Sequence, residues 1–193
     1  MRLPFLPEPR GLVASDMEWG RIPRAYHKVT IEKVPDLDYR PPFLGYYQAL
    51  PHIARVGKGL ILLGPFGSGK TALGVCCLKR TLAWGGSVLF ILASELPSVV
   101  WNDEAFDDDW TMEARAVFVD LLLLDDIGSE SRNDAVRGCI ETLLRKRVAE
   151  GLATVITSNL TVEELQSGYP ALMKALQGTH KALRISGMNW RDL

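Results

Sequence analysis

Eight consecutive residues match the phosphate-binding pattern G-x-x-x-x-G-K-[ST]: Gly64, Pro65, Phe66, Gly67, Ser68, Gly69, Lys70 and Thr71. The glycines allow a tight backbone turn that directs N–H groups inward, toward an anion. The ammonium of Lys70 can neutralise the β- and γ-phosphates of a nucleotide, and the hydroxyl of Thr71 can bind Mg²⁺. The sequence therefore predicts that these residues, together with Ala72, bind ATP and Mg²⁺.

The residues on either side of this loop support the prediction. The apolar run 59–63 has the composition of a buried parallel strand, and residues 72–84 have that of a helix. A helix that begins at such a loop adds the positive end of its dipole. The alternative is a glycine-rich turn without a ligand, but a strand before the loop and a helix after it favour the nucleotide site.

A second apolar run, residues 121–124, ends in the carboxylates Asp125 and Asp126. A buried strand of this kind delivers both residues to the carboxyl edge of a parallel sheet, where ligands bind in open α/β folds. We expect Asp125 to hold Mg²⁺ through its water shell and Asp126 to polarise the attacking water. The alternative is a strand followed by an acidic turn, and the P-loop upstream favours the catalytic interpretation.

A third β-branched and apolar run, residues 153–158, ends at Asn159. An asparagine at this edge can hydrogen-bond both the attacking water and the γ-phosphate. The alternative is that Asn159 serves as a helix cap or turn residue. Thr161, with Glu164 three residues later, fits a capping box and leaves Asn159 free for the site.

In this order, the three strands and their polar ends resemble the layout of AAA+ ATPases. In finer detail the chain resembles helicase loaders of the DnaC/DnaI kind and IstB-type transposition helper ATPases. The resemblance covers about residues 20 to 191 and is carried by four segments: 21–26, 124–130, 156–160 and 185–191. The last of these resembles the final strand and tail of that group.

The resemblance implies a three-layer α/β P-loop fold, an AAA+ core with a five-stranded, mostly parallel sheet and no sizeable lid domain. Residues 1–20 are expected to form an extended N-terminal arm, and residues 21–193 the ATPase domain. The resemblance also implies slow ATP hydrolysis, nucleotide-dependent self-assembly and single-stranded DNA binding. A replicative helicase or a transposase is the partner that it implies.

The chain departs from that family in residues 168–176, where arginines usually reach the γ-phosphate of a neighbouring subunit. This stretch has no arginine, and Lys174 is its one cation, so Lys174 is the candidate for a trans-acting residue. Two alternatives therefore stay open. One is a nucleotide-gated adaptor with little turnover, and the other is a small-molecule P-loop kinase.

Residues 133–150 have the apolar spacing of an amphipathic helix with a basic face formed by Arg137, Arg145, Lys146 and Arg147. Residues two apart diverge on a helix, so Arg145 and Arg147 cannot share one face, and one of them is expected to serve the fold or a neighbouring subunit. Arg137, with Arg132 in the preceding loop, is the candidate for phosphate contacts with DNA. The alternative is an ordinary solvated face.

Residues 101–110 form an acidic stretch flanked by tryptophans. Three interpretations are open: a solvated loop with tucked tryptophans, a surface where bases stack, and a protein-docking loop. The aromatic side chains of Phe43, Tyr46 and Tyr47 fit core packing better than stacking on adenine.

The chain has 193 residues, of which 47% are hydrophobic, a net charge of −1 and a pI near 6.3. One domain of ordinary size is expected, and the charge does not indicate a general nucleic-acid binder. No secretory or membrane-spanning segment is apparent. The three cysteines, Cys76, Cys77 and Cys139, are expected as reduced thiols in a cytoplasmic protein.

Overall fold

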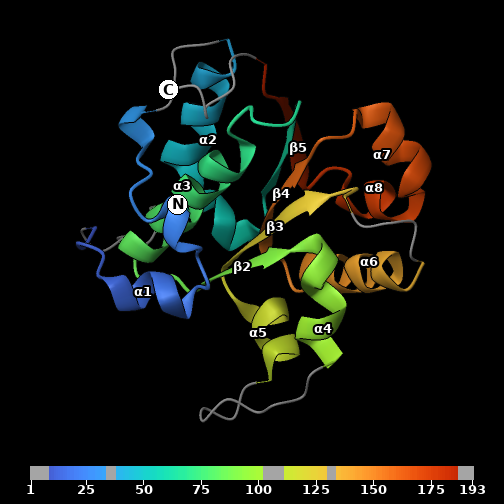
Figure 1. Cartoon of the computed structure of the whole chain (residues 1–193), viewed down its shortest axis with the longest axis horizontal. Helices are drawn as coiled ribbons and strands as arrows, with labels where there is room; N and C mark the ends of the chain where they lie inside the picture. Colours follow the sequence, from blue (N-terminus) through green and yellow to red (C-terminus); the bar gives the residue numbers. More distant parts are fainter. Residues whose placement is uncertain (1–8, 34–37, 102–110, 130–133, 187–193) are drawn as a thin grey trace, which may run out of the picture.

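The central sheet has five strands that all run parallel, in the order β2-β3-β4-β1-β5 (Figure 1). In chain order the strands are β1 Gly59–Leu63, β2 Val88–Leu92, β3 Leu121–Ile127, β4 Ala153–Ser158 and β5 His180–Arg184. The computed structural model describes residues 9–33, 38–101, 111–129 and 134–186. The prediction of a P-loop α/β fold with a five-stranded, mostly parallel sheet is confirmed.

The strands form where the sequence is continuously apolar, because helices cover both faces of the sheet. Every residue of β1 and β4 is buried, and residues 121–124 of β3 are completely so. In chain order the helices are α1 Ala14–Trp19, α2 Arg40–Ile53, α3 Lys70–Ala83, α4 Leu96–Trp101, α5 Met112–Phe118, α6 Asp134–Ala149, α7 Val162–Gly168 and α8 Pro170–Leu176.

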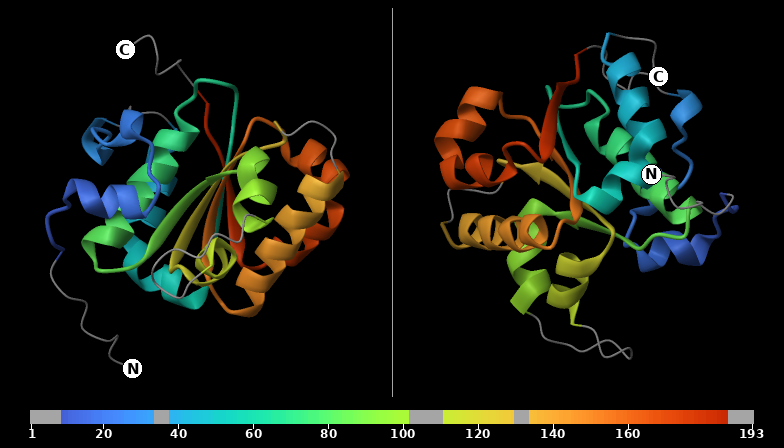
Figure 2. Two further views of the ribbon diagram at one scale, coloured as in Figure 1. Left: turned by 60° about the horizontal axis from the view of Figure 1, so that its bottom comes forward. Right: turned by 180° about the vertical axis from the view of Figure 1, so that it is seen from behind.

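Two apolar cores lie on opposite faces of the sheet and give the molecule three layers (Figure 2). One core joins the sheet to α2 and α3, with Phe43 and Leu73 among its completely buried side chains. The other joins it to α4 through α8, around residues such as Leu144 and Leu172. Strand residues alternate between the cores, as Ile61 and Leu62 do, because neighbouring side chains of a strand point to opposite faces.

The helix boundaries follow the expected signals closely. Gly69, with φ of 86°, precedes α3, and Gly151, with φ of 67°, lies just after α6. Thr161 caps α7: its hydroxyl accepts the Glu164 N–H while the Glu164 carboxylate accepts the Thr161 N–H. The predicted capping box is therefore confirmed, and Asn159 is not the cap.

The N-terminal segment differs from the expected extended arm. Residues 14–19 form the short helix α1, and the segment lies along α3, where the Arg10 N–H donates to the Ala83 carbonyl at 2.8 Å. The Arg115 guanidinium of α5 donates to the Trp19 carbonyl and stacks 4.2 Å from the Trp19 ring. These contacts hold the segment against the domain. They involve residues far away in the sequence, so the prolines and glycines of the segment could not indicate them.

The last strand also differs from the expected position. The segment 185–191 was expected to contain it, but β5 ends at Arg184, and residues 187–193 lie outside the described residues. As an edge strand β5 pairs with β1 alone and is largely exposed. Its sequence therefore has no continuous apolar run, which is the signal that marked the other strands.

Two predictions fall outside the described residues. One concerns the acidic stretch, since residues 102–110 and the side chain of Trp101 are not described. The other concerns Arg132, which is not described either. Their interpretations stay predictions. Among the described residues no helix combines the length and hydropathy needed to span a bilayer.

Candidate nucleotide site

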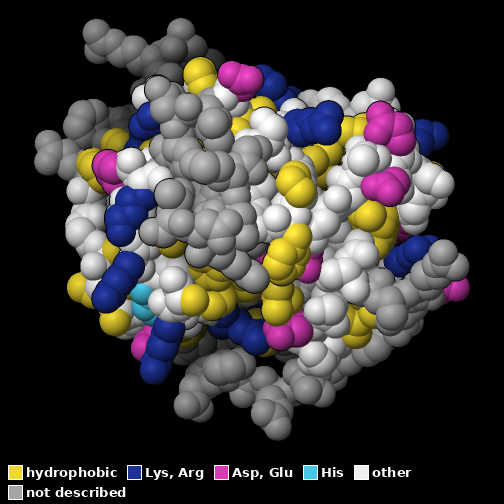
Figure 3. Space-filling view, turned by 45° about the horizontal axis from the view of Figure 1, so that its top comes forward, with side chains coloured by type: hydrophobic (Ala, Val, Ile, Leu, Met, Phe, Trp, Pro, Cys, Tyr) yellow, Lys and Arg dark blue, Asp and Glu magenta, His cyan; other side chains and the backbone are white. Residues whose placement is uncertain are grey.

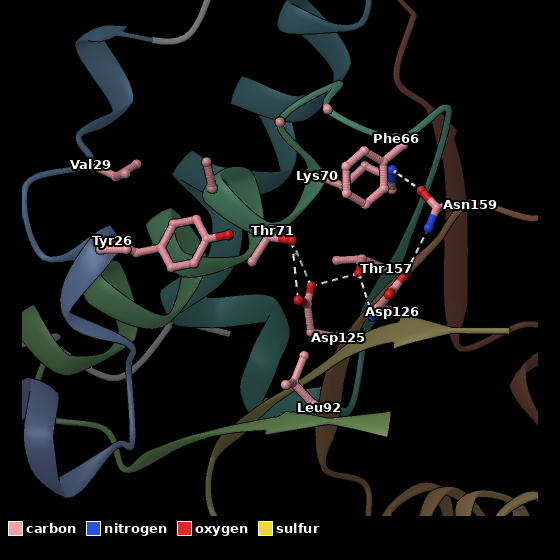
Figure 4. Close-up of a pocket in the computed structure, with 14 residues that line it drawn as sticks. Tyr26, Val29, Phe66, Lys70, Thr71, Leu92, Asp125, Asp126, Thr157 and Asn159 are labelled. Carbon is pink, nitrogen blue, oxygen red and sulfur yellow. Dashed lines mark hydrogen bonds between the residues drawn. The ribbon is translucent and has the colours of Figure 1, made fainter. Parts of the chain in front are cut away.

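A pocket of about 520 Å³ lies at the carboxyl edge of the sheet (Figure 4). Its lining comes from the P-loop and the start of α3, from the ends of β2, β3 and β4, and from the segment before α2. Parallel strands bring their carboxyl ends to one edge, so residues far apart in sequence meet there. The structure brings together Lys70, Thr71, Asp125, Asp126 and Asn159, all of which line this pocket.

The P-loop backbone needs glycine at particular positions. Gly67 and Gly69 have φ of 79° and 86°, a region that other residues rarely adopt. A Cβ on Gly64 would lie 2.2 Å from the Ile185 carbonyl oxygen, so no side chain fits there. Phe66, by contrast, is 70% exposed at the rim of the pocket.

Lys70 lies inside the loop, with only 7% of its surface exposed. Its ammonium donates to the carbonyls of Gly64 and Pro65 and to Asn159 Oδ1, each at 2.8 Å. Burial lowers the pKa of Lys70, and the charges of Asp126 and Asp125 oppose that shift. The cation is thus held at the floor of the loop by neutral acceptors.

The side-chain oxygens of Thr71 and Asp125 lie next to each other in the pocket. The Thr71 hydroxyl lies 3.0 and 3.1 Å from the two carboxylate oxygens of Asp125 and donates its hydrogen to that carboxylate. Asp125 is 5% exposed, and burial raises its pKa against the hydrogen bonds from Thr157 and Thr71, which lower it. A hydroxyl and a carboxylate side by side fit the oxygen ligands that Mg²⁺ prefers.

Asp126 has a left-handed backbone conformation, with φ of 64°. Its N–H donates to the Thr157 hydroxyl at 2.8 Å, and its carboxylate accepts from Asn159 Nδ2 at 2.7 Å. Asn159 thus bridges the Lys70 ammonium and the Asp126 carboxylate (Figure 4). A continuous chain of hydrogen bonds runs from Lys70 through Asn159, Asp126, Thr157 and Asp125 to Thr71, with the Asp126 backbone N–H making the link to Thr157.

Several residues of the pocket were not assigned a role from the sequence. Tyr26 and Val29 line it from the segment before α2, although Tyr26 belongs to a segment that carried the family resemblance. Lys79 of α3 fixes this segment, because its ammonium donates to the carbonyls of His27 and Val29 at 2.7 Å each. No sequence signal placed Thr157 in the site, since a threonine inside a strand is ordinary.

The aromatic residues near α2 have the packing role favoured from the sequence. Phe43 is completely buried and stacks on Tyr47, with ring centroids 6.2 Å apart. Tyr46 packs against the same core and donates to the Lys58 carbonyl. None of the three lines the nucleotide pocket among the described residues. The prediction of core packing is confirmed.

Three predicted cations lie away from the pocket lining. Lys174 is exposed on α8, beside a separate hollow of about 410 Å³. Arg137 is half-buried on α6, 5.4 Å from the Tyr169 ring centre. Arg147 is completely buried and Arg145 is exposed, so Arg147 is the one of the two that serves the fold and it does not belong to the basic face.

The family model of the IstB-like ATP-binding proteins matches residues 44–178, more than half of the chain. A comparison with curated protein sequences gave no match.

Among solved structures, that of the DnaC helicase loader has a TM-score of 0.72 and 24% identity, over 85% of this chain and 100% of that one. DnaI has a TM-score of 0.72 and 21% identity, over 87% and 93%. The replication initiator DnaA, bound to AMPPCP and single-stranded DNA, has a TM-score of 0.67 and 17% identity, over 83% and 51%. These likenesses establish the AAA+ fold.

Proposed function

The chain belongs to the family of IstB-like ATP-binding proteins, which are ATPases of the AAA+ fold, and from this premise we propose that it acts on a DNA-processing partner in replication or transposition. The observation that carries the proposal is the chain of hydrogen bonds that joins the P-loop to the ends of β3 and β4. This arrangement brings the Lys70 ammonium, a hydroxyl beside a carboxylate, and a second carboxylate into one pocket. Those are the parts that phosphoryl transfer to water requires.

In this proposal residues 64–72 bind the phosphates. The N–H groups of the loop and of the first turn of α3 face the anion, and the helix dipole adds to the attraction. Lys70 neutralises the β- and γ-phosphates after its ammonium exchanges neutral carbonyl acceptors for phosphate oxygens. Tyr26 and Val29 border the same pocket and are placed to contact the base or ribose.

Thr71 and Asp125 would hold Mg²⁺, the first directly and the second through water. The fit rests on their oxygens, which lie 3.0 Å apart inside the pocket. A bound Mg²⁺ neutralises charge on the β- and γ-phosphate oxygens. Burial of Asp125 raises its pKa, and a cation beside it would favour the ionised carboxylate.

Asp126 and Asn159 would orient the attacking water. The Asp126 carboxylate accepts the proton of the water, while the Asn159 amide holds the water or a γ-phosphate oxygen. In the structure the two side chains are already paired at 2.7 Å. When the Lys70 ammonium turns to phosphate, Asn159 Oδ1 becomes available as an acceptor.

The structural neighbours support the proposed partners. DnaC is a helicase loader, and the DnaA structure contains single-stranded DNA. By analogy, this chain assembles with copies of itself when nucleotide is bound and acts on a replicative helicase or a transposase. Single-stranded DNA is the proposed nucleic-acid ligand.

Two surfaces are candidates for the DNA contacts. One contains Arg137 and Arg132, although Arg137 is half-buried against Tyr169. The other contains the exposed Arg24 and Lys28, which flank Tyr26 next to the nucleotide pocket. Figure 3 shows several Lys and Arg side chains along its left edge. The second surface is continuous with the pocket lining, so DNA binding there would depend on nucleotide.

A salt-dependent DNA titration tests this proposal. Fluorescence anisotropy with labelled single-stranded DNA is measured at several salt concentrations, with and without an ATP analogue. The parent is compared with the double variants Arg24→Ala/Lys28→Ala and Arg132→Ala/Arg137→Ala. Replacing the pair that contacts phosphate should reduce the slope of log binding constant against log salt concentration by about 0.7 for each lost contact.

The titration also has a control and a contradicting result. Lys70→Ala should remove the effect of the ATP analogue and leave the nucleotide-independent binding unchanged. If the parent binds no DNA at any salt concentration, the single-stranded DNA ligand is wrong and the protein partner alone remains.

A nucleotide-gated adaptor with little turnover is the second candidate. The observation in its favour is that α8 has no arginine and that its one cation, Lys174, is exposed. The close pairing of Asp126 with Asn159 favours hydrolysis instead. The rate of phosphate release distinguishes the two.

A further inference from the structure

Thr157 lies between the two aspartates, on the neighbouring strand β4, and only 1% of its surface is exposed. Its hydroxyl donates to Asp125 Oδ1 at 2.7 Å and accepts the Asp126 N–H at 2.8 Å. A hydroxyl has one hydrogen, so the donor of this side chain is used in the bond to Asp125, and one of its acceptor sites is used in the bond from Asp126.

Both aspartates face the pocket because the strand is irregular at this point. In a regular strand two consecutive side chains point to opposite faces of the sheet. Here β3 pairs with β4 at Leu124 with Ile156 and next at Ile127 with Ser158, so β3 has one extra residue. This β-bulge, with Asp126 at φ of 64°, lets Asp125 and Asp126 line the same pocket.

The bulge leaves the Asp126 N–H without a main-chain acceptor on β4, and the Thr157 hydroxyl supplies one from the side chain. An unpaired N–H at this depth would be costly, because buried polar groups need a partner. The left-handed backbone of Asp126 adds strain that the surrounding structure must hold. Thr157 is the side chain that satisfies the bulge and contacts both aspartates.

We propose that Thr157 is a positioning residue of the nucleotide site, whose hydroxyl holds the bulge that turns Asp125 and Asp126 toward the ligand. Through Asp125 it orients the carboxylate assigned to Mg²⁺. Through the Asp126 backbone it orients the carboxylate assigned to the attacking water. This inference rests on the proposed function, which assigns those two roles.

The central test replaces the hydroxyl by a methyl group in Thr157→Val, which keeps the shape of the side chain. Mg²⁺ is titrated at a fixed concentration of a fluorescent ATP analogue, and the midpoint of Mg²⁺-dependent binding is measured. We expect the midpoint to rise about 10- to 100-fold, the usual effect of losing a group that orients a metal ligand. Turnover should fall about tenfold or more on the same basis.

Two further variants make the comparison specific. Thr157→Ser keeps the hydroxyl and should return both quantities close to those of the parent. Thr154→Val is the matched control, since Thr154 lies on the same strand and is equally buried. Its hydroxyl accepts from Arg147 Nε and does not contact the site, so only thermal stability should change.

A double-mutant comparison separates positioning from general loss of structure. At saturating Mg²⁺ in the Asp126→Asn background, Thr157→Val should cause little further loss of turnover, because the step that it supports through Asp126 is already removed. The shift in the Mg²⁺ midpoint should persist, because it acts through Asp125. A purely structural defect would reduce turnover by the same factor in both backgrounds.

The outcomes are distinguishable from those of the proposed function. If the parent binds the ATP analogue without any dependence on Mg²⁺, the proposed metal site is wrong, and this inference with it. If the parent depends on Mg²⁺ and Thr157→Val matches it, this inference alone is overturned. Should Thr157→Val fail to fold, Thr157→Ala is used for the same two measurements and the same comparison with Thr157→Ser.

Discussion

At the scale of single residues, Lys70 is a buried cation whose hydrogen-bond acceptors are uncharged. It is nearly buried, and its ammonium has three oxygen acceptors at 2.8 Å, none of which is charged. Burial lowers its pKa, so the cation is poorly compensated until an anion approaches. A nucleotide phosphate would supply that compensation.

Lys70→Ala should therefore abolish measurable ATP binding. Each hydrogen bond to a charged group contributes about 1.5–3 kcal/mol, so we expect affinity to fall about a hundredfold or more. Isothermal titration with an ATP analogue measures this, and Lys146→Ala serves as control. Lys146 is an exposed lysine paired with Glu113, away from the pocket. Unchanged affinity in Lys70→Ala would contradict the assignment of the P-loop.

At the scale of elements, Arg147 joins α6 to the end of α5 and the start of β4. Its guanidinium donates to the carbonyls of Ala116, Val117 and Ala153 and to the Thr154 hydroxyl. Burial lowers its pKa to about 9, which leaves it charged at neutral pH. The cation satisfies the last carbonyls of α5 from the side.

Arg147→Met should leave these acceptors without a donor and cost at least about 2 kcal/mol of stability. Each kcal/mol lowers the Tm of a domain of this size by about 2–4 °C, so a fall of about 4–8 °C is expected. Thermal unfolding measures it, with the exposed Arg145→Met as control on the same helix. Equal Tm values for the two variants would show that the buried contacts contribute nothing.

The same elements show what could be predicted from the sequence. The strands β1, β3 and β4, which have continuous apolar runs, were predicted within a residue or two, because both of their faces are buried. The edge strand β5 was misplaced because it lacks such a run. The bulge at Asp126 depends on the pairing of β3 with β4, and the burial of Arg147 instead of Arg145 depends on contacts with α5 and β4, neither of which local patterns encode.

At the scale of the whole molecule, burial of His180 links stability to pH. Burial and, to a smaller extent, the nearby charge of Arg147 lower the pKa of its imidazole from 6.5 to about 4. The unfolded chain therefore takes up this proton near pH 6.5, while the folded protein does so only near pH 4. This contribution to stability is present above pH 6.5 and is lost as the pH falls toward 4.

His180→Gln should remove this component of the acid sensitivity. Between pH 7 and pH 4.5 the Tm of the parent should fall more steeply than that of the variant. At about 1.4 kcal/mol per pKa unit, the difference in stability is at most about 3 kcal/mol. Parallel curves for the two proteins would show that His180 titrates alike in the folded and unfolded states.

Assembly is the second property of the whole molecule. In the proposed function the γ-phosphate lies at a boundary between copies, and Lys174 is the candidate that reaches it. Turnover per subunit should therefore rise with protein concentration, and Lys174→Ala should reduce that rise. Light scattering with an ATP analogue and single-stranded DNA should detect the larger species. A monomer under all these conditions would contradict self-assembly and favour assembly templated by a partner.

The most direct test of the central claim is the release of phosphate from ATP and Mg²⁺ by the parent and by Asp126→Asn. Asparagine tolerates the left-handed backbone at this position, so the bulge is retained while the base is lost. We predict that the variant binds ATP like the parent and releases phosphate about a hundredfold more slowly or worse. Equal rates of release would contradict the assignment of this pocket as the site of hydrolysis.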